Sequence, residues 1–138
     1  MPIQIERRAY GPASTQEEVA AIRARLRRIG KSSLVWQEMP VQSTFSVSVM
    51  MDEIHRLTES LDWFHLIVDL THADPPPQEV RTALYKGLDQ LPKMRRCACF
   101  TGRNFLLNAA VKFVLAAVRV PVTMHKTLEE ALREVGDA

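Results

Sequence analysis

The segment Trp63–Leu70 constrains the fold of this chain more than any other stretch. Its sequence, WFHLIVDL, is apolar at nearly every position and lacks the alternation of a strand that has one face in water. A nearly continuous apolar run of this length is typical of a central strand that is covered on both faces. We therefore expect a sheet built around Trp63–Leu70, with helices packed over it.

The remaining sequence alternates between the periodicity of strands and that of helices. We expect further strands at Ile3–Arg8, Ser33–Met39, Met94–Thr101 and Val120–Met124. Apolar stripes at helical spacing predict helices over Thr15–Ile29, Val47–Leu61, Gln78–Leu91, Asn104–Val118 and Leu128–Val135. Expected N-caps are Thr15, Ser46 or Ser48, Asn104 and Thr127. Strands that alternate with helices predict an α/β fold whose sheet is largely parallel from Val47 onward.

Length and composition limit the class of protein further. With 138 residues, 46% of them hydrophobic, and a net charge of +2, the chain is expected to fold as one globular domain, 1–138. The longest apolar stretch, Phe105–Val118, is interrupted by Asn108 and Lys112 and is too short to cross a bilayer. The first residues lack the apolar core of a secretion signal, so we expect a cytoplasmic protein.

The two cysteines and the clusters of basic residues do not lead us to expect a redox site, a metal site or a nucleic-acid interface. Cys97 and Cys99 would share one face of a strand, and we interpret them as buried apolar residues, the alternative being a redox or metal role. Basic residues cluster at 23–31 and 93–103, but no aromatic side chains lie among them to stack on bases, so nucleic acid is not the expected partner.

Polar residues gather where the expected parallel strands end. Since ligands of open α/β sheets bind outside the carboxyl ends of the strands, we take three loops, 69–74, 101–104 and 125–127, as the candidate site. Helix N-termini there could form an anion-binding rim, with Thr101, Arg103, Asn104 and Lys126 as the candidate residues. The structural alternative is that these residues are helix caps and turns.

The familiar catalytic patterns are absent from the sequence. No glycine-rich nucleotide loop or nucleophile elbow occurs, and the four histidines lack the spacing of metal ligands. We therefore expect no enzymatic activity, no cofactor and no metal.

Three stretches resemble the STAS family, the fold of anti-sigma-factor antagonists and of the C-terminal region of sulfate transporters, and more closely its divergent antagonist-like branch. They are LIVDLT at 66–71, RCACFTG at 96–102, and VRVPV at 118–122 followed by TLEEAL at 127–132. The resemblance covers about residues 44–136. It implies a mixed, largely parallel sheet of four to five strands with helices mainly on one face. Residues 1–40 would then be a divergent extension of the sheet with one extra helix, which could also mediate a homodimer.

The resemblance also implies a regulatory role. It implies a module that binds another protein, such as a regulatory kinase or an anti-sigma-like partner, through the loop that carries Asp69, Thr71, His72 and Asp74. In family antagonists a serine at the start of the following helix is phosphorylated, which disrupts docking. Here Asp74 is followed by three prolines, so we expect a binder without the usual phosphoserine switch.

Two other functions fit parts of the pattern. A receiver-like phosphoacceptor domain would place Asp69, Thr101 and Lys126 at the ends of three successive strands, although the first expected strand lacks the acidic residues that hold Mg²⁺ in such domains. A carrier of small molecules or lipids would hold an apolar ligand beneath the helices.

Overall fold

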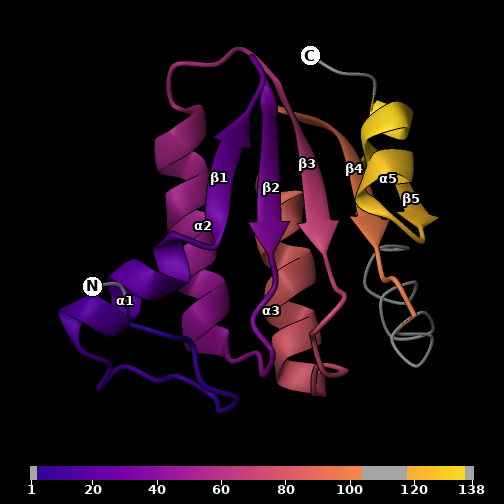
Figure 1. Cartoon of the computed structure of the whole chain (residues 1–138). Helices are drawn as coiled ribbons and strands as arrows, with labels where there is room; N and C mark the ends of the chain where they lie inside the picture. The colour runs from indigo at the N-terminus through magenta and orange to yellow at the C-terminus, as the bar shows by residue number, and fades with distance from the viewer. Residues whose placement is uncertain (1–2, 104–117, 136–138) are drawn as a thin grey trace.

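A computed structural model describes residues 3–103 and 118–135 of the chain. Strands and helices alternate along much of it (Figure 1). The described strands are β1 (Leu26–Ile29), β2 (Ser33–Gln37), β3 (Phe64–Asp69), β4 (Met94–Phe100) and β5 (Val122–His125). The described helices are α1 (Gln16–Arg23), α2 (Thr44–Thr58), α3 (Gln78–Asp89) and α5 (Leu128–Val135). The α/β class expected from the sequence is confirmed.

The five strands form one sheet in the order β1-β2-β3-β4-β5. β1 and β2 are antiparallel, and every later neighbour pair is parallel. The sheet is therefore mixed and largely parallel, as predicted. β3 occupies its middle position, and its residues from Phe64 to Val68 are buried. The prediction that Trp63–Leu70 contains a central strand is confirmed.

Helices cover both faces of the sheet, but unequally. α2 and α3 lie together behind the sheet in Figure 1, whereas α5 lies in front of its β4–β5 side. The larger core joins α2 and α3 to the strand residues that point toward these two helices, such as Leu66 and Val68. The smaller core packs α5 on strand residues of the other face, including Ile67 and Ala98. Because side chains alternate along a strand, one buried strand supplies both cores.

Two expected elements in the N-terminal region are wrong. The helix expected over Thr15–Ile29 ends at Arg23, and Leu26–Ile29 instead forms an edge strand antiparallel to β2. The exposed side chains of Arg27 and Arg28 lie on that edge strand. Ile3–Arg8, expected as a strand, has no strand partner and runs as an irregular segment. The sheet therefore begins at β1.

The other boundaries differ by a few residues. α2 begins one turn before the expected position, because Ser43 and Ser46 form a capping box there. The expected Val120–Met124 strand is shifted to Val122–His125. The helix expected over Asn104–Val118 falls outside the described residues, except for Val118.

Cys97 and Cys99 are free and buried, as expected for apolar filler. Among the helices of the described residues, none has the length and apolar character required to cross a membrane.

Candidate functional site

The carboxyl ends of β2, β3, β4 and β5 meet at one edge of the sheet, where the polar loops were expected to converge (Figure 1). We call the loop residues 69–74, 101–103 and 125–127 the carboxyl rim. Hydrogen bonds between neighbouring strands continue past the strand ends into these loops. They run from Glu38 N to Asp69 O (3.0 Å), Leu70 N to Phe100 O (2.9 Å), Thr101 N to His125 O (3.1 Å) and Gly102 N to Lys126 O (2.9 Å). The backbone of the rim is therefore held in place by the sheet.

Asp69 and Thr71 are paired with each other in a tight turn. One carboxylate oxygen, Oδ1 of Asp69, accepts hydrogen bonds from the amide of Thr71 at 2.9 Å and from its hydroxyl at 2.6 Å. Such an aspartate-centred turn fixes both side chains. Gly102 lies beside it with a φ of 59°, and a Cβ on Gly102 would be 3.1 Å from Cγ2 of Thr71. The turn therefore packs closely against the neighbouring loop.

His72 and Asp74 lie at the exposed part of the same loop. The Asp74 amide donates to the carbonyl of Pro40 at 2.8 Å, and the Asp74 carbonyl accepts from the side-chain amide of Gln42 at 3.3 Å. The Asp74 carboxylate forms an ion pair of 2.7 Å with Arg7. The structure thus brings the four predicted docking residues together in one loop and adds a contact from the N-terminal segment.

The residues predicted to form an anion-binding rim are more dispersed. Thr101 is buried, whereas the side chains of Arg103 and Lys126 are exposed, and Asn104 lies outside the described residues. At the start of α5, Thr127 accepts the amide of Glu130 at 3.2 Å, and the Glu130 carboxylate accepts the amide of Lys126 at 3.1 Å. A carboxylate of the chain itself therefore occupies this helix N-terminus, as the capping interpretation requires.

Arg25 lies at the same edge of the sheet, although the sequence predicted it within the helix expected over Thr15–Ile29. Its guanidinium donates to the carbonyl of Gln37 at 3.0 Å and to the carbonyl of Glu38 at 2.9 Å. Partial burial lowers the pKa of Arg25, and the carboxylates of Glu38 and Asp69 oppose that shift. Arg25 therefore ties the start of β1 to the end of β2.

Glu38 is the second residue that sequence reasoning missed. Its side chain is almost fully buried, with 3% exposed, and Oε1 accepts the amide of Met39 at 2.8 Å. Burial raises the pKa of Glu38 to about 7, against the opposing effects of the Met39 hydrogen bond and the Arg25 charge. The pKa of Cys99 is raised well above its ordinary value, first by its hydrogen bond with Cys97, then by burial, and also by the charge of Glu38. One weak signal in the sequence could have indicated the burial of Glu38: it directly follows a buried strand and lies two residues before Pro40.

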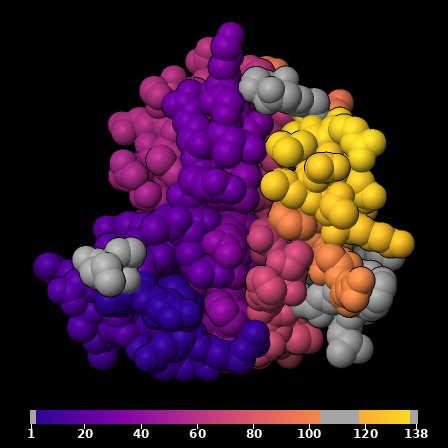
Figure 2. All heavy atoms as spheres, in the orientation of Figure 1, coloured from indigo at the N-terminus to yellow at the C-terminus, as the bar shows by residue number. Residues whose placement is uncertain are grey.

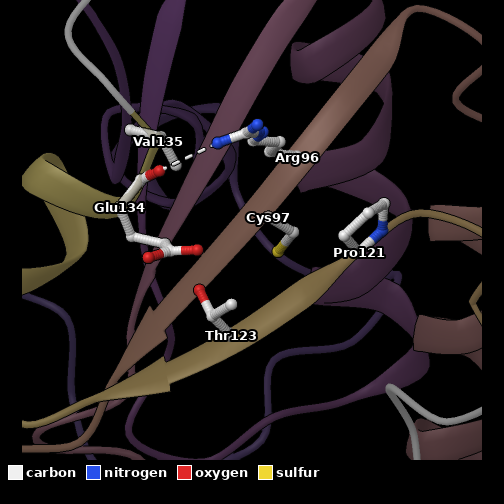
Figure 3. Close-up of a pocket in the computed structure, with 6 residues that line it drawn as sticks. All are labelled: Arg96, Cys97, Pro121, Thr123, Glu134 and Val135. Atoms are coloured by element: carbon white, nitrogen blue, oxygen red, sulfur yellow. Dashed lines mark hydrogen bonds between the residues drawn. The ribbon is translucent and has the colours of Figure 1, made fainter.

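Two cavities lie away from the carboxyl rim, near the opposite ends of the strands. One, of about 190 Å³, is lined by residues that include Arg96, Thr123 and Glu134 (Figure 3). There the Arg96 guanidinium donates to the backbone carbonyl of Glu134 at 3.2 Å. The other, of about 400 Å³, lies by the last turn of α2, where Lys93 donates to the carbonyls of Thr58 and Glu59. Neither cavity is lined by a residue of the predicted docking loop or of the predicted anion-binding rim.

No protein-family model, curated protein or solved structure matches this chain. The membership of the STAS family therefore stays a prediction that rests on three short stretches of sequence. Within residues 3–103 and 118–135, no group of three or more histidine, cysteine, aspartate or glutamate side chains could hold a metal ion.

Proposed function

We propose that the chain is a non-catalytic docking module that binds another protein through its carboxyl rim. One observation carries this proposal: interstrand hydrogen bonds hold the backbone of the rim, and charged or polar side chains of its loops are exposed. Interstrand hydrogen bonds hold the loops, while the side chains of His72, Asp74, Arg103 and Lys126 are exposed. A surface that is already ordered loses little conformational entropy when a partner binds, which favours recognition.

The pairing of Asp69 with Thr71 gives the docking loop a defined shape. One oxygen of the Asp69 carboxylate, Oδ1, accepts the amide and the hydroxyl of Thr71. A side-chain oxygen that accepts the backbone amide two residues further on closes a local turn. Asp69 and Thr71 thus serve to hold the shape of the loop on which His72 and Asp74 are displayed.

The proposed partner is a regulatory protein of the kind that the sequence resemblance implies. The start of α3 bears on how such binding is controlled. The residue before α3 is Pro77, and a proline side chain has no hydroxyl that a kinase could phosphorylate. We therefore propose that docking here is controlled by something other than a phosphoserine at this helix.

Affinity capture with matched variants tests the proposal. The rim variant is Lys126→Glu, which reverses an exposed charge, and the control is Lys31→Glu, at another exposed lysine, in the turn between β1 and β2. We expect a partner that binds the native chain and the control with the same affinity, and that binds the rim variant at least fivefold more weakly. Equal affinity for all three proteins would refute docking at the rim.

The receiver-like alternative makes a different prediction for Asp69. Acetyl phosphate with Mg²⁺ should then phosphorylate its carboxylate, which mass spectrometry of the intact chain detects as an added phosphoryl group. We expect no such product from Asp69, because residues 3–8, which would have to supply the acidic residues that hold Mg²⁺, do not form a strand of the sheet. A phosphoryl group mapped to Asp69 would favour the receiver-like function.

A further inference from the structure

The N-terminal segment reaches the carboxyl rim. We call residues 3–10 the N-terminal strap. In the space-filling view the indigo N-terminal residues lie along the lower part of the molecule, against the segment that follows β3 (Figure 2). The contact is made by Arg7, whose Nη1 is 2.7 Å from Oδ1 of Asp74 and whose Nη2 donates to the carbonyl of His72 at 3.4 Å.

Tyr10 anchors the strap, because it is the residue of this segment that enters the core. Its side chain is 2% exposed, and its carbonyl accepts the hydroxyl of Ser43 at 2.6 Å. The Tyr10 hydroxyl also accepts the amide of Glu6 at 3.0 Å, and the Arg8 guanidinium lies 3.9 Å from the centre of its ring. Ile5 packs against the core while partly buried. The anchor therefore keeps Arg7 near the rim.

The bond between Arg7 and the rim is itself weak. The side chains of Arg7 and Asp74 are 57% and 52% exposed. Ion pairs as exposed as this one contribute little to stability, since water competes for both charges. Arg7 can therefore leave the rim while Tyr10 stays in place.

The backbone that carries the acceptors of Arg7 is held by hydrogen bonds that do not involve Arg7. The loop that carries them is fixed by the hydrogen bond from the Asp74 amide to Pro40 and by that from Gln42 to the Asp74 carbonyl. The His72 carbonyl and the Asp74 carboxylate thus project from a hydrogen-bonded backbone as two neighbouring acceptors. Two acceptors side by side suit the planar fork of a guanidinium better than the single point of an ammonium.

We propose that His72 and Asp74 form an arginine-binding site that Arg7 fills within the chain, and that an arginine of a partner segment binds there by displacing Arg7. This inference rests on the proposed docking function and adds the chemistry of the partner, a segment that presents a guanidinium. The strap then acts as a weak internal competitor. Since an exposed pair contributes about 0.2–1 kcal/mol, removing Arg7 should tighten arginine binding by about 1.5- to 5-fold.

Titration with N-acetyl-arginine amide tests the site without requiring the partner. Backbone amide shifts of residues 72–74 are followed by NMR in the native chain, in Arg7→Ala, and in Arg7→Ala combined with Asp74→Asn. We expect Arg7→Ala to bind the probe about 1.5- to 5-fold more tightly than the native chain. We expect Asp74→Asn to abolish saturation, and N-acetyl-lysine amide to bind more weakly than the arginine probe.

Asp62→Asn provides the matched control, because Asp62 is an exposed aspartate before β3, at the opposite end of that strand. In the Arg7→Ala background it should leave probe binding unchanged. Equal titration of the native chain and Arg7→Ala, or binding that survives Asp74→Asn, would overturn the inference. If a partner is captured in a manner that depends on Lys126 and yet the arginine titration fails, the inference is wrong while the docking function stands.

Discussion

Replacing Glu38 with glutamine should change how the stability of the chain depends on pH. Glu38 is buried and has a pKa of about 7, compared with an ordinary value of 4.5. The difference corresponds to about 3 kcal/mol of folding free energy that is lost when the buried carboxyl group must be ionised. Glutamine has nearly the same shape and can still accept the Met39 amide, but it carries no charge.

The direction follows from which state binds the proton more tightly. Because the pKa of Glu38 is raised in the folded chain, the folded state holds the proton to higher pH than the unfolded state does. The penalty is absent below about pH 4.5, grows as the pH rises toward 7, and is constant above that. The native chain should therefore lose stability relative to Glu38→Gln between pH 5 and 8.

Urea unfolding of both proteins at pH 5, 6, 7 and 8 measures this effect. We expect the free energy of unfolding of Glu38→Gln, relative to the native chain, to increase by about 2–3 kcal/mol from pH 5 to pH 8. Taking the difference between the two proteins removes the titration of other groups. Glu59→Gln, at an exposed glutamate, should give a flat difference and serves as the control. A flat difference for Glu38→Gln as well would refute the reasoning.

Three further substitutions test the packing around the rim and between the helices. Tyr10→Ala should lower the free energy of unfolding by about 3–5 kcal/mol in urea titrations, because it empties a buried aromatic site. Gly87→Ala should cost about 1 kcal/mol, since the added methyl would lie 2.7 Å from Cε of Met51. In a Met51→Ala background the same change should instead stabilise α3 by about 1 kcal/mol, and a double-mutant cycle by thermal unfolding reveals the sign change. Gly102→Ala should cost about 1–2 kcal/mol in calorimetry, because an alanine is strained at a φ of 59° and would crowd Thr71.

The sequence predicted the centre of the sheet well and its N-terminal margin poorly. β3 was predictable because a continuous apolar run has few alternatives to a buried strand. Leu26 and Ile29 misled the prediction, because their three-residue spacing suits one stripe of a helix. In the strand that they actually form, they point to opposite faces of the sheet. Ile3–Arg8 alternates like a strand but finds no strand partner. Pairing is a property of the folded sheet, and periodicity within one segment does not report it.

The candidate site was predicted in its location and only partly in its members. The loop with Asp69, Thr71 and Asp74 was found because polar residues after a buried strand must emerge at the sheet edge. Glu38 and Arg25 escaped notice, since the burial of a charged side chain depends on segments that are distant in sequence. The contact of Arg7 with Asp74 is of the same kind, because it joins residues that are 67 positions apart in the sequence.

The antiparallel pairing of β1 with β2 has a consequence for the order of folding. These two strands are joined by a tight connection, so their residues meet after closing a very short loop, whereas each parallel pair must first enclose an intervening segment of chain. Short loops close faster and at lower entropic cost, which favours local contacts in the early stages. We expect substitutions at Leu26 to slow refolding in stopped-flow experiments, while substitutions at Met124 mainly accelerate unfolding. The hairpin would then be in place when β3 forms. The apolar β3 could pair with it quickly, which would shorten the time in which β3 can aggregate with other chains.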